Sequence, residues 1–554
     1  MTQTPDAPAD LWRMSATELA EAIRSKQVSS REVIEAHLRR IEAVDPDVNA
    51  VPVVLGEQAL QAADAADRAV VLGSDLPRLH GVPFVVKSNI DVAGTPTTQG
   101  VRAFADAYPQ VNAPIVERMK AAGAIPIGRT NMPNLAVRWH CESELYGATV
   151  NPWDRSRTAG ASSAAVAAAL ATGMSPLGLD NDGLGSLRHP AQCCGISVLK
   201  PGLGRVPDAS TVAGGQVGAI GAQLVNVNGP LARRVADLQV AFEVIAGYTW
   251  RDPWSVPAPL RGPEARNPIH VALVVDPAGQ GTAKQVQEAV RAAARALQSV
   301  GYVVEELEPP SIELAARTCL DMLNTPDIRA MWQMTAGMLP ADTQQFLEQF
   351  YAEAGDPDPV AAMQAFATRH SLLKAWSEFQ QTHPMIVAPI CTELPFKAGT
   401  DLSENRVAAE IHSLRMTTAV NALGLPAVAL PVGVADGLPQ AVQVIGPRYR
   451  EDLCLDAGQA IETSLGIIIP STRARRQPPG MTGAPTATDS ELAAHCSWAG
   501  TVRAGALAVG RARDMYAEDG GRMLVKVASL WPVADASGEQ MDQAEIMRYL
   551  SEMI

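Results

Sequence analysis

The stretch RTAGASSAAVAAALATGMSPLGLDNDGLGSLRHPAQCCG, residues 157–195, is rich in alanine and glycine. Hydroxyl groups interrupt it at the adjacent Ser162 and Ser163, and again at Ser186 beside two glycines. Serines at such places are commonly helix N-caps or turn residues. A segment without bulky side chains also lets a substrate approach closely and leaves the hydroxyls as reactive groups. Other parts of the sequence decide between packing and chemistry.

A lysine at the end of a predicted strand supplies a candidate base. In HGVPFVVKSNID, residues 80–91, Lys87 follows directly after Val85 and Val86, so its stem leaves a buried strand. Burial penalises the charged form of an amine, and a neutral lysine can accept a proton. Around Ser186, DNDGLGSLR leaves backbone N–H groups free to converge on one point. These residues indicate a base, a nucleophile and an oxyanion hole.

These segments resemble the amidase signature family. The resemblance rests on HGVPFVVKSNIDVAGTPTTQG, GRTNMPN, NPWDRSRTAGASSAAVAAALA and LDNDGLGSLRHPAQCCGISVLKPGLGRVP. It continues to VQVIGPRYREDLCLDAGQAIE and so covers roughly residues 10–470. In that family a Ser–cis-Ser–Lys triad hydrolyses amides, and the matching positions in this chain are Lys87, Ser162 and Ser186.

The resemblance implies a role for each of these residues. Ser186 attacks the substrate carbonyl to form an acyl-enzyme, Ser162 relays the proton, and Lys87 receives it. The oxyanion is held by the backbone of the turn that contains Ser186 and, before it, Gly183, Leu184 and Gly185. The supporting positions are Ser163, Asp182 and Arg188. The peptide bond before Ser162 is cis in the family, and no cofactor is implied.

The chain departs from the family at several small-residue positions. Ala161, Ala164 and Ala165 stand where the family usually has glycine, as does Leu184 within the expected oxyanion loop. Ser88 replaces the common aspartate after the lysine. Because glycine adopts backbone conformations that other residues rarely reach, the effect of Ala161 and Leu184 on these turns is left open by the sequence.

Apolar runs of strand length alternate with helical patterns along the first 470 residues, which predicts an α/β fold. Strands are expected within residues 80–91, 121–131, 270–276, 302–308 and 384–390, and a hairpin around the Asp436-Gly437 turn within 426–446. Capping-box patterns begin at Ser15 and Ser29. With the family resemblance, we expect a large mixed twisted sheet covered by helices on both faces.

The composition changes near residue 470. PSTRARRQPPGMTGAPTATDS, residues 470–490, is rich in Pro, Thr and Gly, as linkers are. We therefore expect an amidase signature catalytic domain over residues 1–470, a linker over 471–490 and a small α+β segment over 491–554, to which we assign no function. A strand is expected within 522–530. The final helical pattern stops at Ile554 without a cap, which we interpret as a truncated module.

The overall composition limits the classes of partner, cellular compartment and metal site that we expect. Acidic residues exceed basic ones, 59 against 45, which argues against a nucleic-acid partner. The first twelve residues do not resemble a signal peptide, and the longest apolar run, residues 164–174, is too short to span a membrane. Seven cysteines without CxxC spacing favour a reduced, cytoplasmic setting, and nine histidines without metal-type spacing favour no bound metal. A homodimer is left open.

Three functions remain open on the sequence. The first is hydrolysis of a small-molecule amide, ester or carbamate, as in an aryl amidase or a urethanase. The second is an amidotransferase A-type subunit that releases ammonia from glutamine, and the third is a non-catalytic binding protein on the same scaffold. Trp139 and the methionine-rich part of residues 310–400 are interpreted equally well as substrate pocket or as core.

Overall fold

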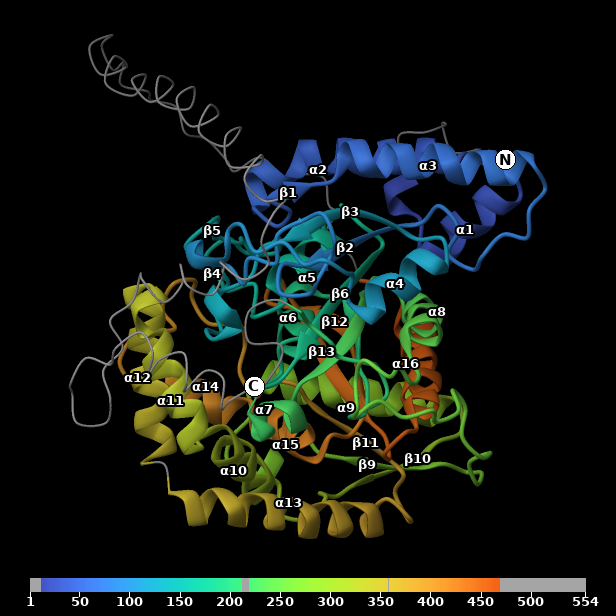
Figure 1. Cartoon of the computed structure of the whole chain (residues 1–554). Helices are drawn as coiled ribbons and strands as arrows, with labels where there is room; N and C mark the ends of the chain where they lie inside the picture. Colours follow the sequence, from blue (N-terminus) through green and yellow to red (C-terminus); the bar gives the residue numbers. More distant parts are fainter. Residues whose placement is uncertain (1–10, 212–218, 357, 469–554) are drawn as a thin grey trace, which may run out of the picture. The chain divides into compact units, whose positions relative to one another are not determined.

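Eleven strands form one sheet in the computed structural model, which describes residues 11–211, 219–356 and 358–468 (Figure 1). They are β1 (Val53–Val54), β2 (Pro83–Lys87), β3 (Ile125–Thr130), β6 (Leu177–Asp182), β7 (Ser197–Lys200), β8 (Val227–Ala232), β9 (His270–Leu273), β10 (Val303–Glu306), β11 (Met385–Pro389), β12 (Ala427–Ala435) and β13 (Leu438–Ile445). Two further strands, β4 (Glu142–Ser143) and β5 (Gly147–Ala148), pair separately.

The sheet is mixed, as predicted. Its order is β1-β3-β2-β6-β8-β7-β12-β13-β11-β9-β10. Strands β3, β2 and β6 run parallel towards one end of this order, and β11, β9 and β10 run parallel at the other. The strands between β6 and β11 pair antiparallel, and β1 adds an antiparallel edge.

The predicted strands are confirmed at all five single runs, and the hairpin is confirmed at β12 and β13. The hairpin turn has positive φ at both Asp436 and Gly437, as a two-residue loop of primed type requires. Strands β6, β7 and β8 were not among the predicted strands. Glycine and polar residues interrupt the apolar pattern of β6 and β8, and β7 is only four residues long.

The α-helices are α1 (Ala16–Arg24), α2 (Ser30–Val48), α3 (Gly56–Val71), α4 (Pro114–Ala121), α5 (Ala164–Ala171), α6 (Arg188–Cys194), α7 (Ile220–Val225), α8 (Val235–Ile245), α9 (Lys284–Ser299), α10 (Ile312–Leu323), α11 (Pro326–Thr335), α12 (Ala341–Ala354), α13 (Pro359–Phe379), α14 (Arg406–Ser413), α15 (Arg415–Leu423) and α16 (Glu451–Leu465). Short 3-10 helices lie at Leu11–Arg13, Arg102–Phe104, Asn134–Ala136, Pro277–Gly279 and Ala336–Met338. The capping boxes at Ser15 and Ser29 are both formed.

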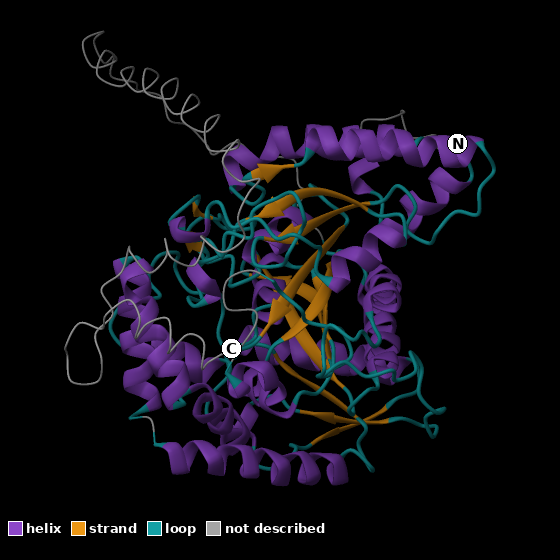
Figure 2. Ribbon diagram, in the orientation of Figure 1, coloured by secondary structure: helices purple, strands orange, loops and turns teal. Residues whose placement is uncertain are grey.

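Helices cover both faces of the sheet, as predicted (Figure 2). Successive strand residues point to opposite faces. In β2, Phe84 and Val86 join a core with residues of α4, α8, α9 and α16. Val85 joins a different core, which contains all of α5 and much of α6. All residues of β2 and β13 are buried, which agrees with the apolar run that precedes Lys87 in β2.

The region from residue 469 to the C-terminus lies outside the described residues, and so do the predicted linker and C-terminal segment with its strand and final helix. Among the described helices, none is both long enough and apolar enough to cross a membrane.

Candidate active site

The candidate base lies at the carboxyl end of β2, where this strand runs parallel to β6. Val86 pairs with Leu179, so the next residues of the two strands, Lys87 and Asp180, lie side by side. Lys87 lies two residues after Val85 and therefore points to the same face of the sheet, which α5 covers. Its side chain is fully buried.

The adjacent serines, Ser162 and Ser163, lie just before α5. Lys87 Nζ donates a 2.7 Å hydrogen bond to Ser162 Oγ, and the Ala161–Ser162 peptide bond is cis. A β-carbon on Gly178 in β6 would lie 2.2 Å from Val166 Cγ1. The glycine therefore lets α5 pack directly on β6, which brings Ser162 within reach of the lysine.

The turn that carries Ser186 is held by Asp182. The Asp182 carboxylate accepts hydrogen bonds from the backbone N–H of Gly185 at 2.8 Å and of Leu187 at 3.2 Å. Arg188 donates to both of its oxygens, at 3.0 and 3.1 Å. Burial alone would raise the pKa of Asp182, but the Arg188 guanidinium holds it well below its ordinary range. Asp182 is therefore an anion that fixes the turn.

Gly185 has the φ value that this turn needs. Its φ is +93°, in the region that favours glycine, whereas Leu184 is not among the residues with positive φ. The sequence left open what Leu184 does at a position where the family usually has glycine. Because the positive φ falls on Gly185, Leu184 does not need the conformation that favours glycine, and its side chain lines the cavity next to Ser186.

Ser163 ties the two turns together. Its backbone N–H donates to the carbonyl of Ser186 at 3.2 Å, and its hydroxyl donates to the carbonyl of Asn181 at 3.4 Å. The structure thus brings Lys87, Ser162 and Ser163 into one buried cluster with the Ser186 turn. Ser162 and Ser186 line the same cavity.

Asp180 is a site residue that the sequence pattern did not single out. Its Oδ1 lies 2.6 Å from Lys87 Nζ, with both side chains fully buried, and Oδ2 has no hydrogen-bond partner among the described residues. Burial raises the pKa of this carboxyl, and the Lys87 ammonium opposes that shift. Lys87 also donates to Asn181 Oδ1 at 3.1 Å. The residue pairing of β2 with β6 would have revealed Asp180, but β6 was not predicted.

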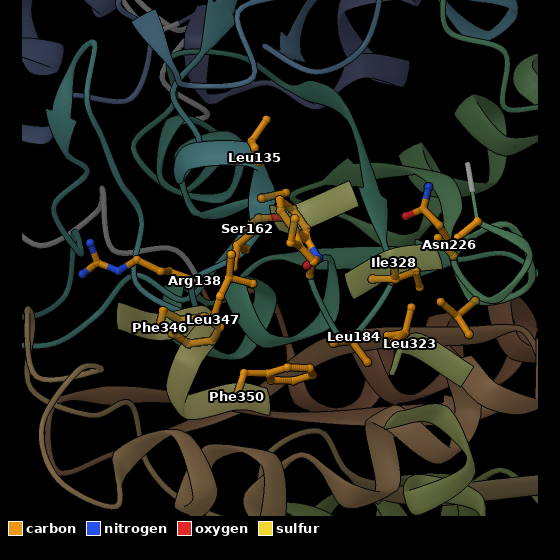
Figure 3. A pocket seen from close by; sticks show the side chains of 18 of the residues that line it. Leu135, Arg138, Ser162, Leu184, Asn226, Leu323, Ile328, Phe346, Leu347 and Phe350 are labelled. Carbon is orange, nitrogen blue, oxygen red and sulfur yellow. The ribbon is translucent and has the colours of Figure 1, made fainter. Parts of the chain in front are cut away.

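A cavity of about 310 Å³ opens onto the two serines (Figure 3). Its walls are mainly apolar and aromatic: Leu135, Val137, Trp139, Leu184, Ala219, Ala222, Val225, Leu323, Ile328, Met331, Trp332, Phe346, Leu347, Phe350 and Tyr351. Trp139 and the α10–α12 region therefore belong to the cavity wall, although Met322 lies in the core and Met334 is exposed.

Arg138 is the only charged side chain among the described residues that line this cavity. Its guanidinium binds the Asp401 carboxylate through two hydrogen bonds of 2.9 Å and also contacts Asp342 and Glu142. In Figure 3 it points away from Ser162. The positive charge is therefore matched within the protein, and the cavity presents an essentially apolar surface.

His140, Cys193 and Cys194, which lie near the candidate site in the sequence, are packed in the protein interior. His140 is buried and its Nδ1 lies 3.2 Å from Thr158 Oγ1. Cys193 and Cys194 are buried, and burial raises the pKa of both thiols, which makes them poor nucleophiles.

Comparison with known families gives two matches. A family model described as Amidase matches residues 32–455. A second model, described as a family of unknown function (DUF6544), matches residues 489–554, which lie outside the described part of the chain.

Individual relatives agree with the first match. An indoleacetamide hydrolase of Bradyrhizobium diazoefficiens is 40% identical, over 83% of this chain and 88% of its own length. The A-type subunit of the glutamyl-tRNA(Gln) amidotransferase of Moorella thermoacetica is 31% identical, over 82% of this chain and 97% of its own. The crystal structure of a bacterial aryl acylamidase of the amidase signature family superposes with a TM-score of 0.73 at 25% identity, covering 83% of this chain and 99% of that one.

Proposed function

The chain belongs to the amidase signature family and acts on non-peptide amides, and from this premise we propose that it hydrolyses the amide of an apolar aromatic acid through an acyl-enzyme on Ser186. The observation that carries the proposal is the cavity of aromatic and aliphatic side chains that ends at Ser162 and Ser186.

The cavity suits a small aromatic acyl group. Its volume of about 310 Å³ falls at the lower end of the range of about 300–1,000 Å³ that is usual for ligand pockets. Trp139, Phe346 and Phe350 form a contiguous aromatic wall, with Trp139 and Phe346 ring centroids 5.3 Å apart in an edge-to-face arrangement. A relative that is 40% identical to this chain is named an indoleacetamide hydrolase. Indoleacetamide is the amide of an apolar aromatic acid.

The contact between Lys87 and Ser162 supports a stepwise acyl transfer. Ser186 Oγ attacks the carbonyl carbon and gives its proton to Ser162 Oγ. Ser162 passes its own proton to the lone pair of a neutral Lys87 Nζ, 2.7 Å away. The proton returns by the same route to the nitrogen of the departing amine or ammonia as the C–N bond breaks. Water then attacks the ester on Ser186, and the free acid leaves.

Asp180 completes the base in this scheme. A carboxylate at 2.6 Å stabilises the ammonium that Lys87 forms when it takes the proton, much as an aspartate stabilises the imidazolium of a Ser-His-Asp triad. Because both groups are buried, the contact is poorly screened by water. We therefore assign the basic function to the Lys87–Asp180 pair.

Backbone N–H groups of the Ser186 turn form the proposed oxyanion hole. The N–H of Gly185 already donates to Asp182, so the donors are those of Gly183, Leu184 and Ser186. Gly183 and Leu184 line the cavity next to the nucleophile. The same donors would stabilise the tetrahedral intermediates of esters and carbamates, so we expect aryl esters and aryl carbamates to react at the same site.

Glutamine is a poorer fit than an aromatic amide, although a glutamyl-tRNA(Gln) amidotransferase chain is a relative. Free glutamine carries an ammonium and a carboxylate, which need charged partners inside an apolar pocket. Arg138 is the only charged group of the described lining, and three carboxylates already surround it.

The test is steady-state hydrolysis of indole-3-acetamide, phenylacetamide, acetamide and glutamine by the full chain and by Ser186→Ala. We expect the arylacetamides to be turned over with the highest kcat/KM and Ser186→Ala to lose about 10⁴-fold or more in kcat. A fluorophosphonate probe should label the native chain and leave Ser186→Ala unlabelled. Preference for glutamine, or unchanged labelling of the variant, would contradict the proposal.

A further inference from the structure

Two histidines and a glutamate lie close together at the end of the sheet that is formed by β9, β10 and β11. His270 begins β9, Glu305 lies in the neighbouring edge strand β10, and His383 lies just before β11. Figure 1 shows these three strands side by side at one end of the sheet. One ligand atom from each residue lies within 4.8 Å of the other two. None of these residues lines the catalytic cavity.

Strand pairing explains the convergence. Val303 of β10 pairs with His270 in parallel register, so Glu305, two residues further on, points to the same face. Glu305 Oε2 lies 3.3 Å from His270 Nδ1 and 2.6 Å from His383 Nε2. Two histidine nitrogens therefore meet one carboxylate oxygen.

Thr382 lies beside the other nitrogen of the His383 ring. Its hydroxyl oxygen is 3.1 Å from His383 Nδ1. When Nε2 binds a metal ion, Nδ1 carries the ring proton, and this hydroxyl oxygen can accept it.

Without a metal ion, His383 Nε2 can carry the ring proton and donate it to Glu305 Oε2 at 2.6 Å, a charge-assisted hydrogen bond. A metal ion would replace that proton and take the imidazole nitrogen and the carboxylate oxygen as ligands. The third donor, His270 Nδ1, faces the same oxygen and favours an ion with several ligands over a single proton.

We propose that His270, Glu305 and His383 form a Zn²⁺ site. Two imidazole nitrogens and one carboxylate are a usual zinc ligand set, completed by water in a tetrahedral arrangement. The side chains of His270 and Glu305 are 42% and 49% exposed, which leaves room for that water and a path for the ion. Hydrogen bonding of Nδ1 to Thr382 orients the His383 ring in the way that outer-shell partners orient metal-bound imidazoles.

The bound ion would link the two outermost strands to the segment that leads into β11. An edge strand has one neighbour only, so a cross-link from β10 to His383 stabilises this end of the sheet. The sequence led us to expect no metal, because 35 residues separate His270 from Glu305 and 78 separate Glu305 from His383. Spacing patterns reveal ligands on one turn or helix, whereas strand pairing brings these together.

The test is calorimetric titration of Zn²⁺ into the full chain after removal of metal with a chelator. We expect one equivalent to bind at this site and the melting temperature to rise with Zn²⁺. His383→Ala should lose that equivalent or weaken it at least about tenfold, while His370→Ala, an exposed histidine of α13 outside the cluster, should keep it. Unchanged stoichiometry and affinity in His383→Ala, or no binding by the native chain, would overturn the proposal.

Thr382→Val tests the positioning of the ring with a change that removes no ligand. It deletes the acceptor for the Nδ1 proton, and we expect about 10-fold weaker Zn²⁺ binding. Circular dichroism of each variant checks folding, and Glu305→Gln provides a second ligand variant if His383→Ala does not fold. A raised His383 pKa by NMR without Zn²⁺ binding would show that a proton alone occupies the site.

Discussion

At the scale of single residues, replacing Asp180 with asparagine removes the negative charge beside Lys87 and keeps nearly the same volume. The proposed base then loses the counter-ion of its ammonium and becomes weaker. We expect kcat to fall about 10²-fold and the acid limb of the pH profile of kcat/KM to move to lower pH. Initial-rate assays of arylacetamide hydrolysis between pH 5 and 10 measure both quantities.

The matched control is Asp154→Asn, which removes a carboxylate that does not line the cavity. If Asp180→Asn lowered kcat and left the pH profile in place, Asp180 would serve packing alone.

A pair of glycine variants tests the Ser186 turn. Gly185→Ala places a methyl group 2.6 Å from Thr417 Cγ2 at a φ of +93°, so we expect a loss of about 1–3 kcal/mol in the free energy of unfolding and a large loss of kcat. Gly183→Ala is the control for stability alone, because its nearest neighbour would lie at 3.5 Å, an ordinary contact. Urea unfolding of both variants measures the difference in stability, and equal losses would contradict it; steady-state kinetics of Gly185→Ala measures the loss of kcat.

At the scale of elements, α12 supplies part of the aromatic wall. Phe346 and Phe350, four residues apart, both point from this helix into the cavity region (Figure 3). We expect Phe350→Ala to raise KM for arylacetamides about tenfold with a smaller change in kcat, because the lost contact is made equally in the ground and transition states. Acetamide, which does not reach the ring, serves as the control substrate. An equal rise in KM for both substrates would place Phe350 outside the acyl pocket.

The elements also show which local patterns carry information. Ser15 and Ser29 form the capping boxes that their spacing predicts, because such a box depends on four consecutive residues. Strand β6 was not predicted because its sequence, LGLDND, is not continuously apolar. It contains a glycine against which α5 packs closely, and polar residues that lie in the candidate site. Functional demands at β6 override the pattern of an ordinary strand.

At the scale of the whole molecule, buried charge makes stability depend on pH. Burial raises the pKa of Glu410 to about 7, although Arg406 opposes the shift, and His189 Nε2 lies 3.5 Å from its Oε1. Since the folded state holds this proton more tightly, the contribution of Glu410 is complete below its ordinary value of 4.5 and is lost as the pH rises towards 7.

Glu410→Gln should remove this dependence. Between pH 5 and 7 we expect the free energy of unfolding of the variant to rise relative to the native chain by about 2 kcal/mol. Urea unfolding at both pH values measures the change. A constant difference between the two proteins would show that Glu410 titrates alike when folded and unfolded. Burial lowers the pKa of His189 to about 3, so the imidazole stays neutral over this range.

We propose that residues 1–470 form the catalytic domain, with a linker over 471–490 and a separate segment over 491–554. All described site residues precede residue 474, and the two family matches fall on either side of the linker. A chain that ends at Ala474 should therefore keep the kcat/KM of the full chain for arylacetamides. A loss of soluble protein or of activity on truncation would mean that the C-terminal residues are needed by the catalytic part.

The sequence by itself determined the α/β class, most of the strands, the hairpin at Asp436-Gly437 and the candidates Lys87, Ser162 and Ser186. Periodicity, turn chemistry and a long ordered motif are local properties, so they can be detected along the chain. Only the tertiary structure decided that Asp180 touches the lysine, that Gly185 rather than Leu184 takes the unusual φ, and that Arg138 is neutralised at the cavity wall. It also decided that His270, Glu305 and His383 meet. These contacts depend on which strands pair and in which register, and the free energy that fixes pairing comes from burial across the whole sheet.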